Sequence, residues 1–128
     1  MSEMRPPGRE RDIAIAKALG WTIEADKDGW YRWVDEKGKP YFGSLSKRRA
    51  NAEAKVPMWS TVYPLALLAV MEARDYGWTM ERDRQGADVL VKFWREFFLC
   101  GRAEAPTIAA AASEAALRAL AAEKERGE

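Results

Sequence analysis

The apolar segment "YPLALLAVMEA" at residues 63–73 constrains the fold more than any other part of the chain. In helical projection, Leu65 and Leu68 fall on one side, whereas Leu67 and Met71 fall on another. Apolar side chains therefore cover more than half of the circumference, and a helix of this kind is usually covered by other structure on two sides. The chain has 128 residues, of which 48% are hydrophobic, so it contains enough apolar side chains to build one domain around this helix.

Segments on both sides of this helix change to the period of two that is typical of strands. Residues 30–35 alternate in this way, and in the segment "DVLVKFW" the side chains of Val89, Val91 and Phe93 share one face. Residues 96–105 are expected to supply another strand. The expected turns between these strands are "DKDG", "EKGKP" and "RQGA". Strands this close in sequence leave too little chain for parallel crossovers throughout, which favours antiparallel pairing.

Two more helices are expected near the ends of the chain. The first covers residues 9–19 and ends at Gly20, which suits a left-handed C′ position, with Trp21 folding back onto the helix. The second is the alanine-rich segment that starts after "APT" at residues 105–107. The polar and basic segment at residues 44–57 is expected to be a loop with at most one helical turn.

Together these elements predict a single α+β domain over residues 9–124. We expect an antiparallel sheet packed between helices, an α/β/α sandwich, with a short N-terminal helix, a long central helix and a C-terminal alanine-rich helix. Residues 1–8 are expected to form a disordered tail, and residues 125–128 a frayed C-terminus.

The composition excludes several classes of function. There are no histidines and one cysteine, which removes the commonest general base, the commonest metal ligand and any internal disulfide. We therefore expect no catalytic activity, no metal and no cofactor. The formal net charge of +1 does not favour nucleic-acid binding. No signal peptide or membrane-spanning run is visible, so we expect a cytoplasmic protein.

The residues before the central helix are the best candidates for a binding site. Ser60 and Thr61 can be read as an N-cap alone, or as a cap whose free backbone N–H groups also hold an anion such as a phosphate. Pro64 suits the first helical turn under either reading. Nearby aromatic side chains could stack on a base, and arginines could bind phosphate. The full set of candidate ligand-binding residues is Trp59, Ser60, Thr61, Tyr41, Arg48, Arg49 and Arg95.

Several landmarks follow one another along the chain: "DIAIAKALGW", a proline, an aromatic and Ser-Thr before a helix, "GW" before strands, and "APT" before an alanine-rich helix. Their order resembles a family of small phage and prophage proteins, the phage ABA sandwich domain. The chain departs from the family at Val62, where members often carry an acidic residue, and in "IAAAASEAAL". The resemblance implies a sheet between helical layers and a role as a phage accessory protein.

We therefore expect a non-catalytic phage protein that sequesters a small phosphate-bearing or nucleotide-like ligand in the host cytoplasm. A cyclic nucleotide or an ADP-ribose-type immune signal would be such a ligand, and a homo-oligomer could build the pocket. The alternative is a protein-interaction module that inhibits a host complex by direct contact. A histidine-free nucleotide hydrolase that uses Mg²⁺ is the least favoured alternative.

Overall fold

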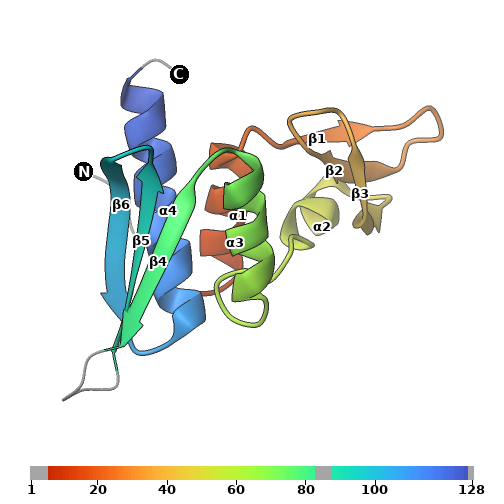
Figure 1. Cartoon of the computed structure of the whole chain (residues 1–128). Helices are drawn as coiled ribbons and strands as arrows, with labels where there is room; N and C mark the ends of the chain where they lie inside the picture. The colour runs from red at the N-terminus through yellow and green to blue at the C-terminus, as the bar shows by residue number, and fades with distance from the viewer. Residues whose placement is uncertain (1–5, 83–87, 127–128) are drawn as a thin grey trace.

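The computed structural model describes residues 6–82 and 88–126. Their elements are α1 (Arg9–Ala18), β1 (Thr22–Ala25), β2 (Tyr31–Val34), β3 (Pro40–Ser46), α2 (Arg49–Ala54), α3 (Pro64–Ala73), β4 (Gly77–Arg82), β5 (Val89–Arg95), β6 (Phe98–Ala105) and α4 (Ile108–Glu125) (Figure 1). The predicted α+β class is confirmed, including antiparallel strands, a short N-terminal helix, a central helix and a C-terminal alanine-rich helix. The predicted turn "RQGA" lies outside the described residues.

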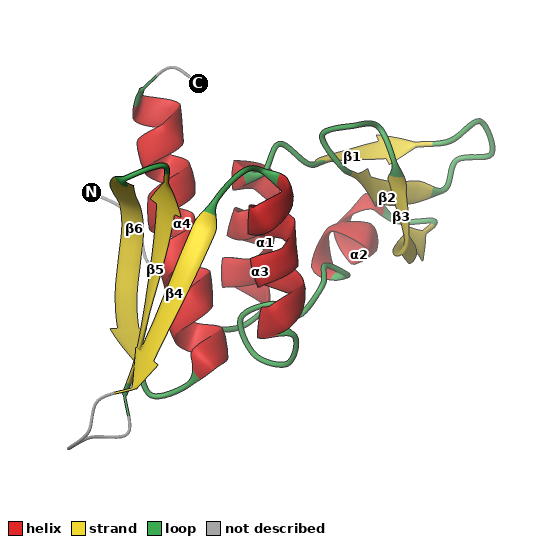
Figure 2. Cartoon of the chain, in the orientation of Figure 1, coloured by secondary structure: helices red, strands yellow, loops and turns green. Residues whose placement is uncertain are grey.

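The strands form two three-stranded antiparallel sheets, with the orders β1-β2-β3 and β4-β5-β6, where the sequence analysis expected one. Helices α1 and α3 lie between the two sheets, and α4 packs against β5 and β6 (Figure 2). Each sheet is made of strands that follow one another in the chain. In the first sheet, tight turns at Gly29 and Gly38, with φ of 83° and 86°, link β1 to β2 and β2 to β3. Neither set of strands needs a partner from the other set, so the sheets stay separate.

Sheet β4-β5-β6 follows the predicted alternation. Val89, Val91 and Phe93 are at most 1% exposed, whereas Leu90, Lys92 and Trp94 on the other face are half-buried. The buried face meets α4, in which the alanines at positions 111, 112, 115, 116 and 119 are fully buried, and the backbone of Ala115 and Ala119 lies against Gly101 of β6. Small side chains allow α4 to lie close to the sheet.

The predicted helix ends are confirmed at α1 and α4. Gly20 has φ of 92°, and the N–H of Trp21 donates to the carbonyl of Ala16 at 3.0 Å. At α4, the Thr107 hydroxyl accepts from the N–H of Ala110 at 3.1 Å. Both signals act within one helical turn, so they are readable from the sequence.

The segment at residues 44–57 is more ordered than expected. Strand β3 continues to Ser46, and α2 follows as a helix of six residues instead of a loop. Ser44 explains the extension, because its hydroxyl accepts from the N–H of Trp33 at 2.8 Å and donates to the carbonyl of Tyr41 at 2.7 Å. In the described part of the chain, no helix is long and apolar enough to cross a membrane.

Candidate functional site

Ser60 is not the N-cap of the central helix. Helix α3 begins at Pro64, and its N-cap residue is Tyr63, which makes no side-chain capping bond. The Ser60 hydroxyl instead accepts from the N–H of Gly8 at 2.8 Å and donates to the carbonyl of Gly8 at 3.2 Å. Gly8, placed in the disordered tail by the sequence analysis, is therefore held in the fold, while residues 1–5 lie outside the described residues.

The backbone amide of Ser60 is also occupied. It donates to Oδ1 of Asp12 at 2.8 Å, and both residues are 1% exposed. Burial raises the pKa of Asp12 above its usual range, and the hydrogen bonds from Ser60 oppose this rise. Because this amide is engaged by a carboxylate of the same chain, it does not offer an open donor to an external anion.

Next to Asp12, Arg11 connects α1 to α4. Its Nη1 donates to the carbonyl of Ala110 at 3.1 Å and to the hydroxyl of Ser113 at 3.0 Å, and its Nη2 lies 3.9 Å from Glu114. Arg11 is 4% exposed, and burial lowers the pKa of its guanidinium. The hydrogen bonds of Asp12 and Arg11 thus hold α1 between the loop that contains Ser60 and α4.

Trp59 belongs to a buried aromatic cluster. Its ring meets that of Trp21 edge-on, with centroids 5.4 Å apart, and only 2% of Trp59 is exposed. Trp33 and Tyr41 contact the same Trp21 ring at 6.5 and 6.2 Å. Trp21 lies between α1 and β1, so its contacts join Tyr41 of β3 to Trp59 in the loop before α3. Trp59 has no open face on which a base could stack.

The three predicted arginines lie in two different places. Arg48 and Arg49 are exposed at the start of α2, where Arg49 donates to the carbonyl of Ile23 at 3.5 Å. Arg95 belongs to the second sheet, where it donates to Oε1 of Glu123 at 3.1 Å and lies over the ring of Tyr76 at 4.2 Å. The fold therefore does not gather the seven candidate residues around one cavity.

Of the predicted residues, Thr61 and Arg95 each line a hollow, and the two hollows are different. The hollow beside Thr61 is the one near the start of α3. Thr61 is exposed and lines a space of 330 Å³ together with Arg9, Asp12 and Lys55. Two basic side chains and one hydroxyl thus line this volume, together with the carboxyl group of Asp12, which opposes the entry of an anion, and apolar side chains.

A surface that the sequence analysis did not anticipate lies on α3. Helix α3 buries Leu67, Leu68 and Met71, but its opposite side is uncovered. We call this side, with the preceding turn, the α3 surface. Its apolar residues are exposed, with Met58 at 48%, Val62 at 53%, Tyr63 at 54% and Leu65 at 68%, and with Ala66, Ala69 and Ala73 along the helix. No helix or strand lies in front of α3 in Figure 1.

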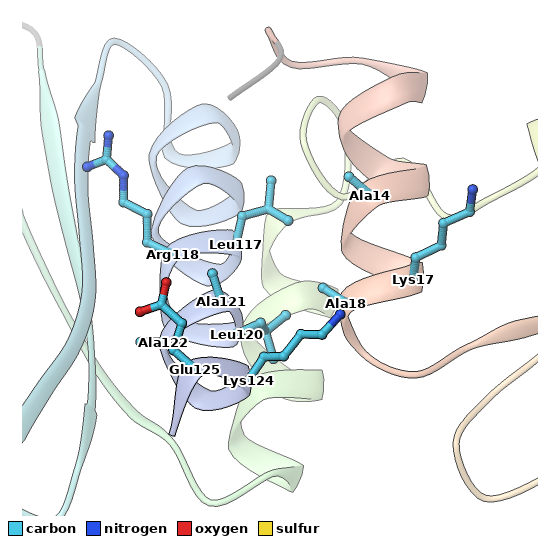
Figure 3. A pocket seen from close by; sticks show the side chains of 10 residues that line it. All are labelled: Ala14, Lys17, Ala18, Leu117, Arg118, Leu120, Ala121, Ala122, Lys124 and Glu125. Atoms are coloured by element: carbon cyan, nitrogen blue, oxygen red, sulfur yellow. The ribbon is translucent and has the colours of Figure 1, made fainter. Parts of the chain in front are cut away.

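Two further hollows lie away from these residues. One, of 460 Å³, separates α1 from α4, and Figure 3 shows Lys124 of α4 extending toward Ala18 of α1 above a floor that includes Leu120. The other, of 650 Å³, lies beside Phe98, Leu99 and Cys100 near the turn between β5 and β6. Neither is lined by the candidate residues of the sequence analysis, apart from Arg95 in the second.

The chemistry of the described residues is sparse. Within residues 6–82 and 88–126, no group of three or more Cys, Asp or Glu side chains is placed to hold a metal ion. In comparisons with known proteins, no protein-family model, no curated protein and no solved structure matches the chain. The resemblance to the phage ABA sandwich family therefore stays a prediction.

Proposed function

We propose that the protein is a non-catalytic interaction module that binds a partner protein through the α3 surface. The observation that supports this proposal is the uncovered apolar side of α3. A helix with apolar residues all around its circumference is normally covered on two sides, and here one side is left to solvent.

Burial of the α3 surface by a partner would contribute several kcal/mol of favourable free energy. Full burial of a leucine, valine or methionine side chain contributes about 1.5–3 kcal/mol. Leu65, Val62 and Met58 are each about half exposed or more, and the Tyr63 ring adds aromatic contact area. Part of this gain is offset by the entropy lost on association, so the surface suits a specific complex of moderate affinity.

The partner element is an amphipathic helix. Leu65, Ala69 and Ala73 are spaced four residues apart, so they form one stripe along α3. The alanines in this stripe let another helix approach closely. Glu72 is the one charged residue in α3, which gives the stripe no basic group for nucleic acid or phospholipid.

The test replaces Leu65 with aspartate. Because Leu65 is 68% exposed, Leu65→Asp should leave folding intact and abolish binding to a partner captured from host lysate. Phe42→Asp is the matched control, since Phe42 is 71% exposed on β3, outside the α3 surface. A photo-crosslinker at position 66 should attach to one helical segment of the partner. Equal capture by both variants, or no capture by the unmodified protein, would argue against the proposal.

A second candidate function is the sequestration of a small phosphate-bearing ligand. The 330 Å³ hollow beside Thr61 supports it, because Arg9 and Lys55 on its wall outnumber the one acidic residue there, Asp12. Thermal shift with cyclic di- and trinucleotides and with ADP-ribose derivatives tests this idea. Lys55→Glu should abolish a shift, and Arg48→Glu should retain it, because Arg48 does not line the hollow. If none of these ligands raises the midpoint of thermal unfolding, this candidate function is wrong.

The cellular setting follows from the predicted resemblance alone. A phage accessory protein that opposes host defence in the host cytoplasm would use either surface without chemical turnover. Capture of a host protein by the α3 surface corresponds to direct inhibition, whereas ligand binding at Thr61 corresponds to removal of a signal.

A further inference from the structure

We propose that two copies of the chain pair through their β6 strands, with a two-fold axis at Ala103, to form one continuous antiparallel sheet. β6 is the outer strand of its sheet, and in the described part of the chain no strand lies on its far side. It is eight residues long and contains no proline. An outer strand presents unpaired backbone groups, and proline, charged side chains and β-bulges are common devices that prevent its pairing with another chain. The register of β6 shifts between Leu99 and Gly101, so the regular part of this edge is residues 101–105, where the charged residues are Arg102 and Glu104.

The register follows from the alternation of side chains. When two identical strands pair in antiparallel fashion about an axis perpendicular to the sheet, facing residues must lie on the same face. The axis must therefore pass through a residue and not between two residues. This condition leaves a small set of possible registers for β6.

The charges on the exposed face select one of these registers. An axis at Ala103 places Arg102 opposite Glu104 of the second copy, and by symmetry this pair forms twice. An axis at position 102 would place arginine opposite arginine, and an axis at 104 would place glutamate opposite glutamate. Opposite charges that face each other across strands stabilise pairing, and like charges oppose it.

The neighbouring strand makes the second copy more favourable. Across the ladder between β5 and β6, Arg102 faces Lys92 and Glu104 faces Leu90. The opposing residue within one copy is thus a like charge for Arg102 and an apolar side chain for Glu104. The nearest acidic partner of Lys92 is Glu81, at 3.8 Å. A second copy supplies the counter-charge that each residue lacks directly across the ladder.

The packing of β6 on α4 is compatible with this pairing. The face of β6 toward α4 carries Gly101, Ala103 and Ala105, and α4 covers it within one copy, so the pairing uses the backbone edge and the charges of the opposite face. Nη1 of Arg118 donates to the carbonyl of Arg102 at 2.8 Å. A carbonyl oxygen has two lone pairs, so the bond from Arg118 leaves one for a second strand. The pairing does not involve the α3 surface and does not rest on the proposed function.

Sedimentation velocity across a concentration series tests the proposal. The unmodified protein should show a reversible monomer–dimer equilibrium. Arg102→Glu places glutamate opposite glutamate twice and should weaken dimerisation about tenfold or more. Glu104→Arg should do the same, and the double variant should restore the dimer, because it exchanges the two charges. The matched control for Glu104→Arg is Glu81→Arg. It makes the same charge reversal on β4, the other outer strand of this sheet, and should leave the dimer intact.

Each outcome decides for or against the pairing. A monomer at every concentration, or a dimer insensitive to Arg102→Glu, overturns it. Loss of the dimer in both single variants without rescue in the double variant overturns the register at Ala103. Hydrogen exchange of the unmodified protein gives a reading that needs no variant to fold. Among residues 101–105, the amides that point away from β5 should gain protection at high concentration, and protection independent of concentration counts against the dimer.

Discussion

Gly101 of β6 should be the glycine at which an added methyl group is most costly. A Cβ built there would lie 2.5 Å from the backbone nitrogen of Ala119 and closer still to the carbonyl oxygen of Ala115. Both atoms belong to the backbone of α4, so no side chain can rotate away. The substitution Gly101→Ala therefore forces strand and helix apart.

The magnitude follows from this geometry. Ordinary van der Waals contact begins at about 3.5 Å, so β6 and α4 must separate by roughly 1 Å along the contact. Overpacking of this kind typically costs about 1–3 kcal/mol, and we expect the upper end because both opposing groups are backbone. A loss of about 3 kcal/mol is a large part of the roughly 5–15 kcal/mol that stabilises a domain. It should lower the midpoint of thermal unfolding by about 10 °C.

Urea unfolding followed by tryptophan fluorescence is the suitable assay, since the chain has six tryptophans. The midpoint should fall without a change in slope. Gly77→Ala is the control, because Gly77 also lies in a strand and no atom lies within 4 Å of an added Cβ. It should be neutral or stabilise by about 0.4–1 kcal/mol. Equal effects of the two substitutions would refute the close contact between β6 and α4.

Three further predictions concern the buried polar groups. Ser60→Ala should destabilise the fold by about 1–3 kcal/mol in urea unfolding, because the N–H of Gly8 loses its acceptor and the carbonyl of Gly8 keeps only the N–H of Asp12 as a donor. Thr61→Ala, at an exposed position, should change stability by less than about 0.5 kcal/mol. Burial raises the pKa of Tyr76 to about 12, so the stability linked to its proton should be lost as pH rises from 10.0 to about 12, and the last step of tyrosinate absorbance should vanish in Tyr76→Phe. Burial also raises the pKa of Asp12 above 3.8. The contribution of its proton to the free energy of unfolding should therefore be full below pH 3.8 and lost as pH rises through the raised pKa. In urea unfolding across this range, the free energy of unfolding should change less steeply with pH in Asp12→Asn than in the unmodified protein.

The two surfaces proposed here can be tested separately. The α3 surface is formed by the turn before α3 and by the helix itself, whereas the pairing edge belongs to β6. Leu65→Asp should abolish partner capture without changing the oligomeric state, and Arg102→Glu should do the reverse. A variant that changed both properties would indicate that partner capture requires the dimer.

The features that the sequence predicted are local. The alternation of Val89, Val91 and Phe93 defines the buried face of β5, since one pleat period separates each side chain from the next. Gly20 ends α1 because a left-handed residue there satisfies carbonyls in the preceding turn. Each of these signals involves residues within four or five positions of one another.

The role of Ser60 was not predictable in the same way. Its hydroxyl bonds to Gly8, which lies 52 positions away in the chain. One local signal could have corrected the cap assignment: Pro64 occupies the first position of α3, which puts the N-cap at residue 63. Nothing in the spacing of the sequence points to Gly8 or to Asp12 as the partners.

Except for β3 and α2 in the segment 44–57, the sequence by itself determined the main element types, most of their ends and the α+β class, because hydrophobic period, turn residues and caps act over one or two turns of chain. The tertiary structure decided that the strands divide into two sheets, that Trp59 is sealed against Trp21, and that one side of α3 stays open. The physical reason is that burial depends on which distant segments meet. An apolar residue is equally apolar in a core and on a binding surface, and the packing of the rest of the chain decides between them.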